Sequence, residues 1–274
     1  MKQTLLLFLL VGSLAGQAQK VNLTKGQLIT INITSTQDMD MTGMQIKNNS
    51  SSTSLLQITD GDNNNFTGSY KLSKLKLDME MMGQQQNYDS DNAADKDSEI
   101  GKSIADKLNK DVAVLINKNT GEVTLKDTAA NAGASKAENP MADIMESFGA
   151  AEEDATAGTA FFVIPKDKKN GDTWIDSSNN KKMKEVKTYT LKSVENGIAT
   201  VQLFATMEGS SSMETQGMQM DMALSAKTEG EIIVDQKTSL VKKRSSVMDL
   251  TGTMDMAGQT IPITSKAIVN ITYN

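Results

Sequence analysis

Histidine and cysteine are both absent from this 274-residue sequence. Without them the chain cannot form a Ser-His or Cys-His nucleophile, and it lacks the usual ligands of a zinc site. It also forms no disulfides, so packing alone must stabilise the fold. A pair of carboxylates could still hydrolyse glycosides, but aromatic residues that stack on sugars make up only 4% of the chain. We therefore expect a protein that is not an enzyme and that uses no cofactor.

Basic clusters and long apolar runs are lacking as well. The formal net charge is −6, and phosphate binding requires clustered Lys and Arg, so we expect no nucleic-acid partner. The longest apolar run, residues 5–14, is too short to cross a bilayer, and nothing later in the chain is longer. The sequence therefore predicts no membrane span.

The short apolar run has the features of a signal peptide. Lys2 precedes it and the small-residue site Gly16-Gln17-Ala18 follows it, which predicts removal of residues 1–18. Gln17 stands where a lipoprotein signal would have its lipid-accepting cysteine. We expect a protein that is exported to the periplasm or the cell exterior and is not lipid-anchored.

Methionine, in contrast, is abundant, with 18 residues. Four copies of a Met-acid-Met tripeptide each lie beside a glycine, and alternation of apolar and polar residues next to a turn is typical of a strand end. We expect each copy to direct its thioethers to one face and its carboxylate to the other. The copies are Met39-Asp40-Met41, Met79-Glu80-Met81, Met220-Asp221-Met222 and Met254-Asp255-Met256.

The same alternation runs through most of the chain and predicts a mainly β protein. Asn119-Thr120-Gly121 and Glu195-Asn196-Gly197 are hairpin turns, the second of type I′. A register change near Ser73 indicates a β-bulge. We predict polar turn material over residues 48–53, and a helix capped by Asp97 or Ser98 after a polar stretch at 83–97. The favoured architecture is a large, strongly curved antiparallel sheet, or half-barrel, with one or two helices packed on its concave side.

The mature chain, residues 19–274, is predicted to be a single β-rich domain. Two weakly similar halves, about residues 21–127 and 161–274, are joined by an Ala/Gly/acid-rich segment at 128–160. This segment contains a predicted helix at 140–148, with Asn139 as its cap and Pro140 at its first position. Met141 and Phe148 belong to its apolar stripe.

Several segments spread over the mature chain make it similar to a family of uncharacterised exported β-rich proteins, mostly from Bacteroidota. These are Met79 to Gln84, Tyr88 to Asp91, Val114 to Val123, Asn170 to Trp174 and Tyr189 to Gly197. The resemblance implies a β-rich fold and export, and no activity. In architecture alone, the expected sheet is also similar to periplasmic lipoprotein carriers, in which a curved half-barrel holds acyl chains.

Unbranched methionines suit an adaptable apolar surface, whereas Val and Ile are better strand formers. Our hypothesis is that a concave, Met-rich face binds a lipid, another hydrophobic molecule or a partner protein. An envelope scaffold with a filled core is the alternative, and Met-only binding of Cu(I) or Ag(I) is a third, although exported copper sites usually add His or Cys. The candidate ligand-binding residues are Met39, Met41, Met79, Met81, Met220, Met222, Met254, Met256, Met141 and Phe148.

Overall fold

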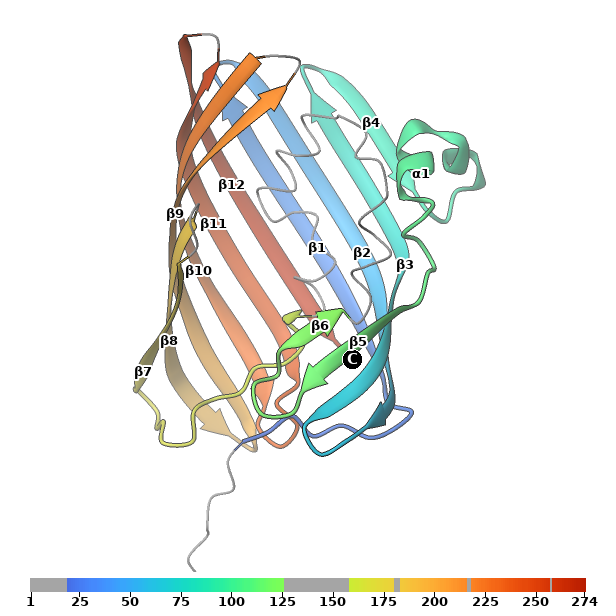
Figure 1. The fold of residues 1–274 in the computed structure, drawn as a ribbon, viewed down its shortest axis with the longest axis vertical. Coiled ribbons are helices and arrows are strands. Elements are labelled where there is room, and N and C mark those ends of the chain that lie inside the picture. Colours follow the sequence, from blue (N-terminus) through green and yellow to red (C-terminus); the bar gives the residue numbers. More distant parts are fainter. Residues whose placement is uncertain (1–18, 126–157, 180–182, 216–217, 257) are drawn as a thin grey trace, which may run out of the picture.

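The computed structural model describes residues 19–125, 158–179, 183–215, 218–256 and 258–274. The predicted signal peptide at residues 1–18 and the predicted helix at 140–148 lie outside them. In the described part, twelve strands form one antiparallel sheet that curves into an open half-barrel (Figure 1). The mainly β fold expected from the sequence is therefore confirmed.

The strand order across the sheet is β6-β5-β3-β2-β1-β12-β11-β10-β9-β8-β7, and β4 also pairs with β3. Most neighbours in the sheet are neighbours in sequence; the exception at the centre is the pairing of β1 with β12. The strands are β1 Leu28–Met41, β2 Met44–Gly61, β3 Asn65–Met81, β4 Gln84–Asp89, β5 Val112–Asn117, β6 Val123–Leu125, β7 Thr173–Asn179, β8 Met183–Glu195, β9 Ile198–Thr215, β10 Met218–Asp235, β11 Val241–Met256 and β12 Gln259–Tyr273.

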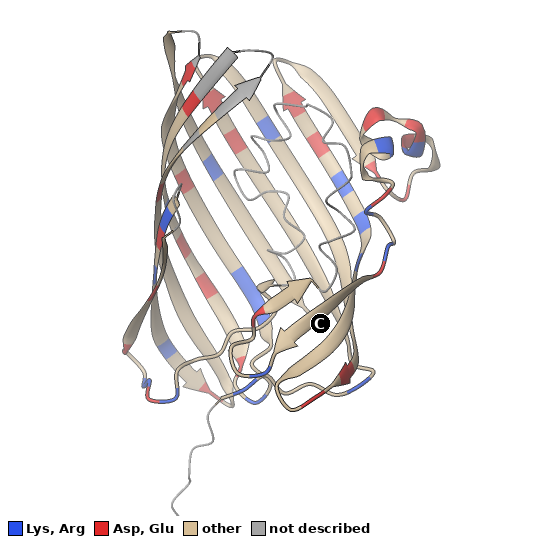
Figure 2. Cartoon of the chain, viewed as in Figure 1, with Lys and Arg blue, Asp and Glu red and all other residues tan. Residues whose placement is uncertain are grey.

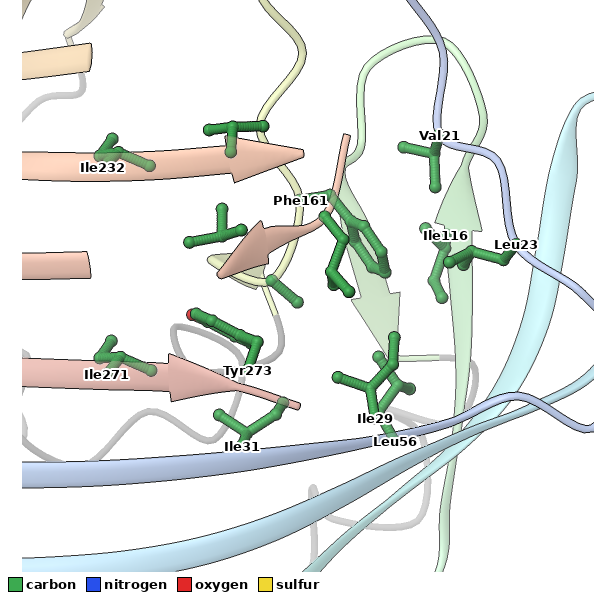
Figure 3. Close-up of a cluster of buried hydrophobic side chains, with 14 of the residues drawn as sticks. Val21, Leu23, Ile29, Ile31, Leu56, Ile116, Phe161, Ile232, Ile271 and Tyr273 are labelled. Atoms are coloured by element: carbon green, nitrogen blue, oxygen red, sulfur yellow. The ribbon is translucent and has the colours of Figure 1, made fainter. Parts of the chain in front are cut away.

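A second layer of chain fills one end of the concave side. Ile31 and Leu56, on β1 and β2, are fully buried there. Phe161, Val21 and Ile116 (the last on β5) pack over this end of the sheet (Figure 3). We call this two-layered cluster the lower core, because it lies at the bottom of Figure 1.

An aromatic group extends the lower core towards the β7 edge. Trp174 stacks on Tyr189 with ring centroids 5.5 Å apart, and Phe162 meets the Tyr189 ring edge-on at 5.0 Å. Trp174 is partly buried and packs against the lower core. This contact agrees with a packing role for the single tryptophan.

The described helices lie at the β3–β4 edge and not on the concave side, where the sequence had placed them. The 3-10 helix η1 (Ala93–Asp97) and α1 (Glu99–Ile104) follow β4 outside the curve of the sheet (Figure 1). Ser98 caps α1, as predicted, by accepting a hydrogen bond from the Gly101 amide at 3.0 Å. The helix is too short to cover the concave face.

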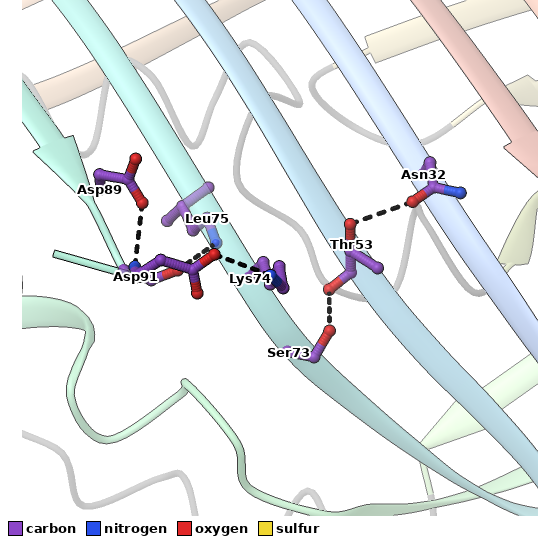
Figure 4. A network of polar contacts seen from close by, with 8 residues as sticks. Asn32, Thr53, Ser73, Lys74, Leu75, Asp89 and Asp91 are labelled. Carbon is purple, nitrogen blue, oxygen red and sulfur yellow. Dashed lines mark hydrogen bonds and ion pairs between the residues drawn. The ribbon is translucent and has the colours of Figure 1, made fainter.

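Local turn chemistry fixes several hairpins. Asn196 and Gly197 both have positive φ, 52° and 78°, as the predicted type I′ turn requires. The predicted bulge is also present: the β2–β3 register shifts opposite Ser73, whose hydroxyl donates to the Thr53 carbonyl at 2.9 Å (Figure 4). These two predictions are confirmed.

The prediction of a turn at residues 48–53 is wrong. These residues form the middle of β2 and pair with β1 on one side and β3 on the other. Strand pairing on both sides satisfies their backbone groups, so the low strand propensity of Asn and Ser is overridden. The polar stretch after Gly83 likewise contains a strand, β4. The turn that precedes β4 is formed by Met82 and Gly83, which both have positive φ, 53° and 77°.

Oppositely charged side chains alternate across the convex face. One row of charged residues crosses six neighbouring strands, and in this row every acidic residue lies opposite a basic residue on the next strand. Opposite charges at these positions stabilise this strand order, whereas an order that paired like charges would be destabilised. Figure 2 shows charged residues distributed along these strands. The row is Glu80, Lys47, Asp38, Lys266, Asp249 and Lys227.

Candidate functional site

The four Met-acid-Met tripeptides lie at one end of the half-barrel. Strands β1, β3 and β11 finish with a copy, and β10, which runs in the opposite direction, carries its copy near its start. Antiparallel pairing therefore brings all four to the same end, at the top of Figure 1. Met222 lies directly opposite Met254, and Met41 directly opposite Met44.

Within the strands, the described methionines of this end belong to the concave face. Met39 and Met41 alternate with Asp38 and Asp40 on β1, in phase with the buried Ile31 of the lower core. Met222 is 2% exposed, whereas its neighbour Asp221 is exposed. The thioethers thus face inward and the carboxylates outward.

These methionines form a second apolar cluster, separate from the lower core, which we call the methionine cluster. Every member and every apolar residue packed against it comes from a strand of the same sheet. In the described part of the chain, no second layer packs on it. Its buried members are Met39, Met41, Met222, Ala226, Leu250, Met254 and Ile263, and Met44, Ile46, Met207, Leu224, Met248 and Ile261 pack against them.

The other predicted ligand-binding residues are either partly buried or have side chains outside the described residues. Met79 and Met81 are partly buried on β3, and their partners on β2, Asn48 and Ile46, place them on the concave side. Met220 pairs with Met256 through the backbone, but their side chains are outside the described residues. So are Met141 and Phe148.

A polar band separates the two apolar clusters on the concave face. Ser50 and Asn48 of β2 face Ser35 and Gln37 of β1, in positions that alternate with outward residues. The Gln37 side-chain amide donates to the Ser265 hydroxyl at 3.2 Å. The Asn48 Oδ1 atom is buried without a hydrogen-bond partner. The concave side thus changes from apolar to polar and back to apolar along the strands.

The chain's only arginine lies where the lower core borders this band, and the sequence reasoning missed it. Arg244 on β11 lies opposite Ile271 of β12 and Ile232 of β10, both buried in the lower core. A signal was available: Arg244 is in phase with Leu250 and Met254 on the same strand. Extending the alternation back from Met254 would have placed it inside.

In the acidic loop after β4, the carboxylates accept hydrogen bonds from neighbouring amide groups and so hold the turn in place. The Asp95 carboxylate accepts hydrogen bonds from the Asp89 amide and from the Asn92 side chain, both at 2.8 Å. Asp89 in turn accepts from the Asp91 amide at 2.9 Å (Figure 4). Asp91 pairs with Lys74 at 2.7 Å and thereby raises the lysine's pKa. These carboxylates stabilise turns and an ion pair.

Among the described residues, no group of three or more acidic side chains is arranged to hold a metal ion. Nor does any helix in these ranges have the length and apolarity that a membrane span needs. A groove of about 570 Å³ crosses β2, β1, β12 and β11. It is lined by outward polar side chains such as Asp38 and Thr264, and also by Met39 and Leu250 of the methionine cluster.

Residues 63–241 match the model of a family of unknown function, DUF6263. The chain belongs to this family. The match agrees with the resemblance to an uncharacterised family; export stays a prediction. No curated protein matches the chain.

Solved structures show only weak likenesses to this chain, and two serve as examples. One, titled as lipid–protein interactions in lipovitellin, is 11% identical with a TM-score of 0.46; the match covers 90% of this chain and 25% of the lipovitellin chain. The other, OpdQ of Pseudomonas aeruginosa, is 6% identical with a TM-score of 0.26, over 92% of this chain and 99% of OpdQ. The protein thus spans about a quarter of lipovitellin, and likenesses this weak carry no functional argument.

Proposed function

We propose that this DUF6263 protein binds a lipid or another long apolar molecule on the methionine cluster. One observation carries the proposal: the lower core has a second layer of chain, whereas every described contact of the methionine cluster lies within a single sheet. Sites for apolar molecules are usually concave and lined by apolar side chains, as this face is.

The residue types of the two clusters support this difference. The lower core consists largely of branched and aromatic side chains, such as Ile29, Leu56 and Phe161, which hold one packing arrangement. The methionine cluster uses unbranched thioethers, which adapt to irregular shapes. A surface that adapts suits ligands of varied shape better than it suits a fixed core.

Together with the predicted signal peptide at residues 1–18, this describes an exported, non-enzymatic carrier or receptor of hydrophobic molecules. The sequence contains the signal pattern. Periplasmic or extracellular location is part of the proposal, and fractionation of host cells tests it.

Dye binding tests the role of the cluster. The purified full chain should bind the neutral apolar dye Nile red. Met222→Gln should weaken binding about tenfold or more, because it places a polar amide within the apolar cluster that the dye contacts. Met222→Leu, which keeps volume and apolarity, should bind like the wild type.

A matched control uses another methionine of the same end. Met82 is 71% exposed in the β3–β4 turn, so Met82→Gln should leave dye binding unchanged. Native mass spectrometry of protein from its own host should show a co-purified lipid mass. A bare polypeptide mass together with absent dye binding would refute the proposal.

The burial of Met39, Met41, Met222 and Met254 favours the alternative, a scaffold protein with a filled core. In that case Met222→Gln would destabilise the fold, and neither it nor the wild type would bind dye. Met-only metal binding is the third hypothesis. The pairs Met41–Met44 and Met222–Met254 are kept apart by β12, and a Cu(I) titration under reducing conditions tests it.

A further inference from the structure

Arg244 is the only arginine of the chain, and the sheet directs it into the concavity. Its cross-strand neighbours on that face, Ile232 and Ile271, are 1% and 7% exposed. The arginine is itself partly buried. A guanidinium among apolar side chains loses hydration, and that loss is costly unless an anion or acceptors replace the water.

No anion among the described residues pairs directly with the guanidinium, because none of their hydrogen bonds or ion pairs involves Arg244. The guanidinium acts on Tyr189 and Tyr273, whose pKa it lowers against the stronger opposing effect of burial. Both are neutral phenols at physiological pH, so they do not compensate the charge.

No other inward charge pairs with it directly. Lys187 and Glu185, on β8, pair with each other at 2.8 Å. Asp176 on the edge strand β7 lies opposite Lys187. On the central strands β1–β3 and β9–β12, the alternation of described residues leaves Arg244 as the sole charged side chain facing inward. Among the described residues, the inward carboxylates thus lie at the β7–β8 edge, and neither forms an ion pair with Arg244.

The position of this charge matches the geometry of an amphiphile. From Arg244 towards the top of the half-barrel, the inward residues of β11 are Ser246, Met248, Leu250 and Met254. At a strand rise of about 3.3 Å per residue, Leu250 lies about 20 Å from Arg244. A bilayer core about 30 Å thick is two acyl chains deep, so one chain spans about 15 Å. A tail starting at Arg244 therefore reaches Met248, about 13 Å away on the same strand, which packs against the methionine cluster.

We infer that the ligand is an anionic single-chain amphiphile, whose carboxylate or phosphate head pairs with Arg244 while its alkyl chain lies on the methionine cluster. This inference rests on the proposed function, because the cluster must bind the tail. The planar guanidinium forms bidentate hydrogen bonds with carboxylate and phosphate alike. The polar band around Ser246 and Ser35 supplies a hydrated setting for the head.

Four probes with the same alkyl chain test the inference: palmitate, hexadecyl phosphate, hexadecanol and hexadecyltrimethylammonium. Isothermal titration with the full chain, below the critical micelle concentrations, should rank the anions above the alcohol and the cation last. Comparing palmitate with the alkyl phosphate distinguishes a fatty acid from a phospholipid head. Free acetate and inorganic phosphate should bind too weakly to measure, because they have no tail.

Substitutions at Arg244 then test whether this residue causes the preference for anionic probes. Arg244→Gln should weaken palmitate binding roughly tenfold or more, the effect of losing one charge-assisted hydrogen bond. It should leave hexadecanol binding within about twofold. Arg244→Lys should retain part of the preference for anions. Lys243→Gln is the matched control, because Lys243 is the preceding residue on the same strand, is exposed, and faces outward.

The outcomes separate this inference from the proposed function. Equal binding of palmitate and hexadecanol by the wild type, unchanged in Arg244→Gln, would overturn the role of Arg244 and leave the apolar site standing. Failure of all four probes to bind would overturn both. Circular dichroism melts of each variant show whether lost binding reflects lost folding.

Discussion

At the scale of single residues, Tyr273 is an ionisable group enclosed by the lower core. It ends β12 and is 1% exposed, among the buried side chains of Figure 3. Its hydroxyl lies 2.7 Å from the Thr159 hydroxyl. Burial raises its pKa to about 12. Burial also raises the pKa of Tyr189 and Tyr88. The folded chain therefore holds phenol protons that the unfolded chain releases.

The first prediction concerns alkaline stability. Below the ordinary tyrosine pKa of about 10 both states keep the proton, and Tyr273 adds no pH dependence. Between pH 10 and 12 the unfolded state binds fewer protons, so stability falls as pH rises, by at most about 3 kcal/mol. Urea denaturation at pH 9, 10 and 11 measures the loss.

Tyr273→Phe removes this titration. The variant should lose about 1 kcal/mol at neutral pH through the missing hydrogen bond with Thr159, and its stability should then fall less between pH 10 and 12. An alkaline loss equal to that of the wild type would show that Tyr273 is not the group responsible.

Individual residues also show what the sequence could predict. The inward direction of Met222 and Met254 follows from strict alternation with Asp221 and Asp255. Arg244 follows the same alternation, but a charged residue inside a sheet contradicts the usual pattern, so sequence reasoning passes over it. The sequence around Arg244 does not show that the sheet curves so strongly that its inner face, with this residue, is enclosed.

At the scale of elements, glycines on the concave face let neighbouring strands curve closely together. A Cβ added at Gly252 of β11 would lie 2.4 Å from the Ala223 carbonyl oxygen and 2.6 Å from the Leu224 side chain on β10. At Gly230 the corresponding approach to the Ser245 carbonyl oxygen is 2.6 Å. Glycine at such positions is typical of bends in curved sheets.

Gly252→Ala should therefore destabilise the protein by about 1–3 kcal/mol, because the backbone of β10 must move to admit the methyl group. Urea denaturation measures the loss. Gly158→Ala is the control: nothing lies within 4 Å of its added Cβ, and the change should stay within about 0.5 kcal/mol. Equal stabilities for the two variants would contradict a role of Gly252 in the curvature.

Elements with strong local signals were predictable, and elements stabilised by neighbours were not. The turn at Asn196-Gly197 and the bulge at Ser73 depend on a few adjacent residues. The middle of β2, with Asn48 and Ser50, and the Gln-rich strand β4 look like loops in sequence. They are strands because β1 and β3 lie beside them, which no local pattern reveals.

At the scale of the whole molecule, the centre of the sheet is formed by strands far apart in sequence. Ile31 of β1 pairs with Tyr273 of β12, the first of eleven such pairs, and the last joins Met41 to Ile263. The sequence predicts a curved sheet but not this order, because nothing local records which strand lies beside which. Pro262 fits the arrangement, since it precedes the first β12 residue that pairs with β1.

Proline substitutions test the central pairing. Ala267 of β12 pairs with both Gln37 and Met248, whereas Ser177 of β7 pairs only with Val186. Ala267→Pro should cost about 3 kcal/mol or more, because proline breaks the central ladder. Ser177→Pro, on an edge strand, should cost less. Thermal melts compare them, and equal losses would contradict the strand order.

The pairing of β1 with β12 also has a kinetic consequence. Adjacent hairpins form from local contacts, but the two groups of strands join only when β12 meets β1. Contacts between residues so distant in sequence slow folding, which for such sheets takes milliseconds to seconds or longer. A chain synthesised from its N-terminus cannot complete the sheet until its last strand is available. The centre of the sheet therefore stays open until synthesis ends, however early the local hairpins form.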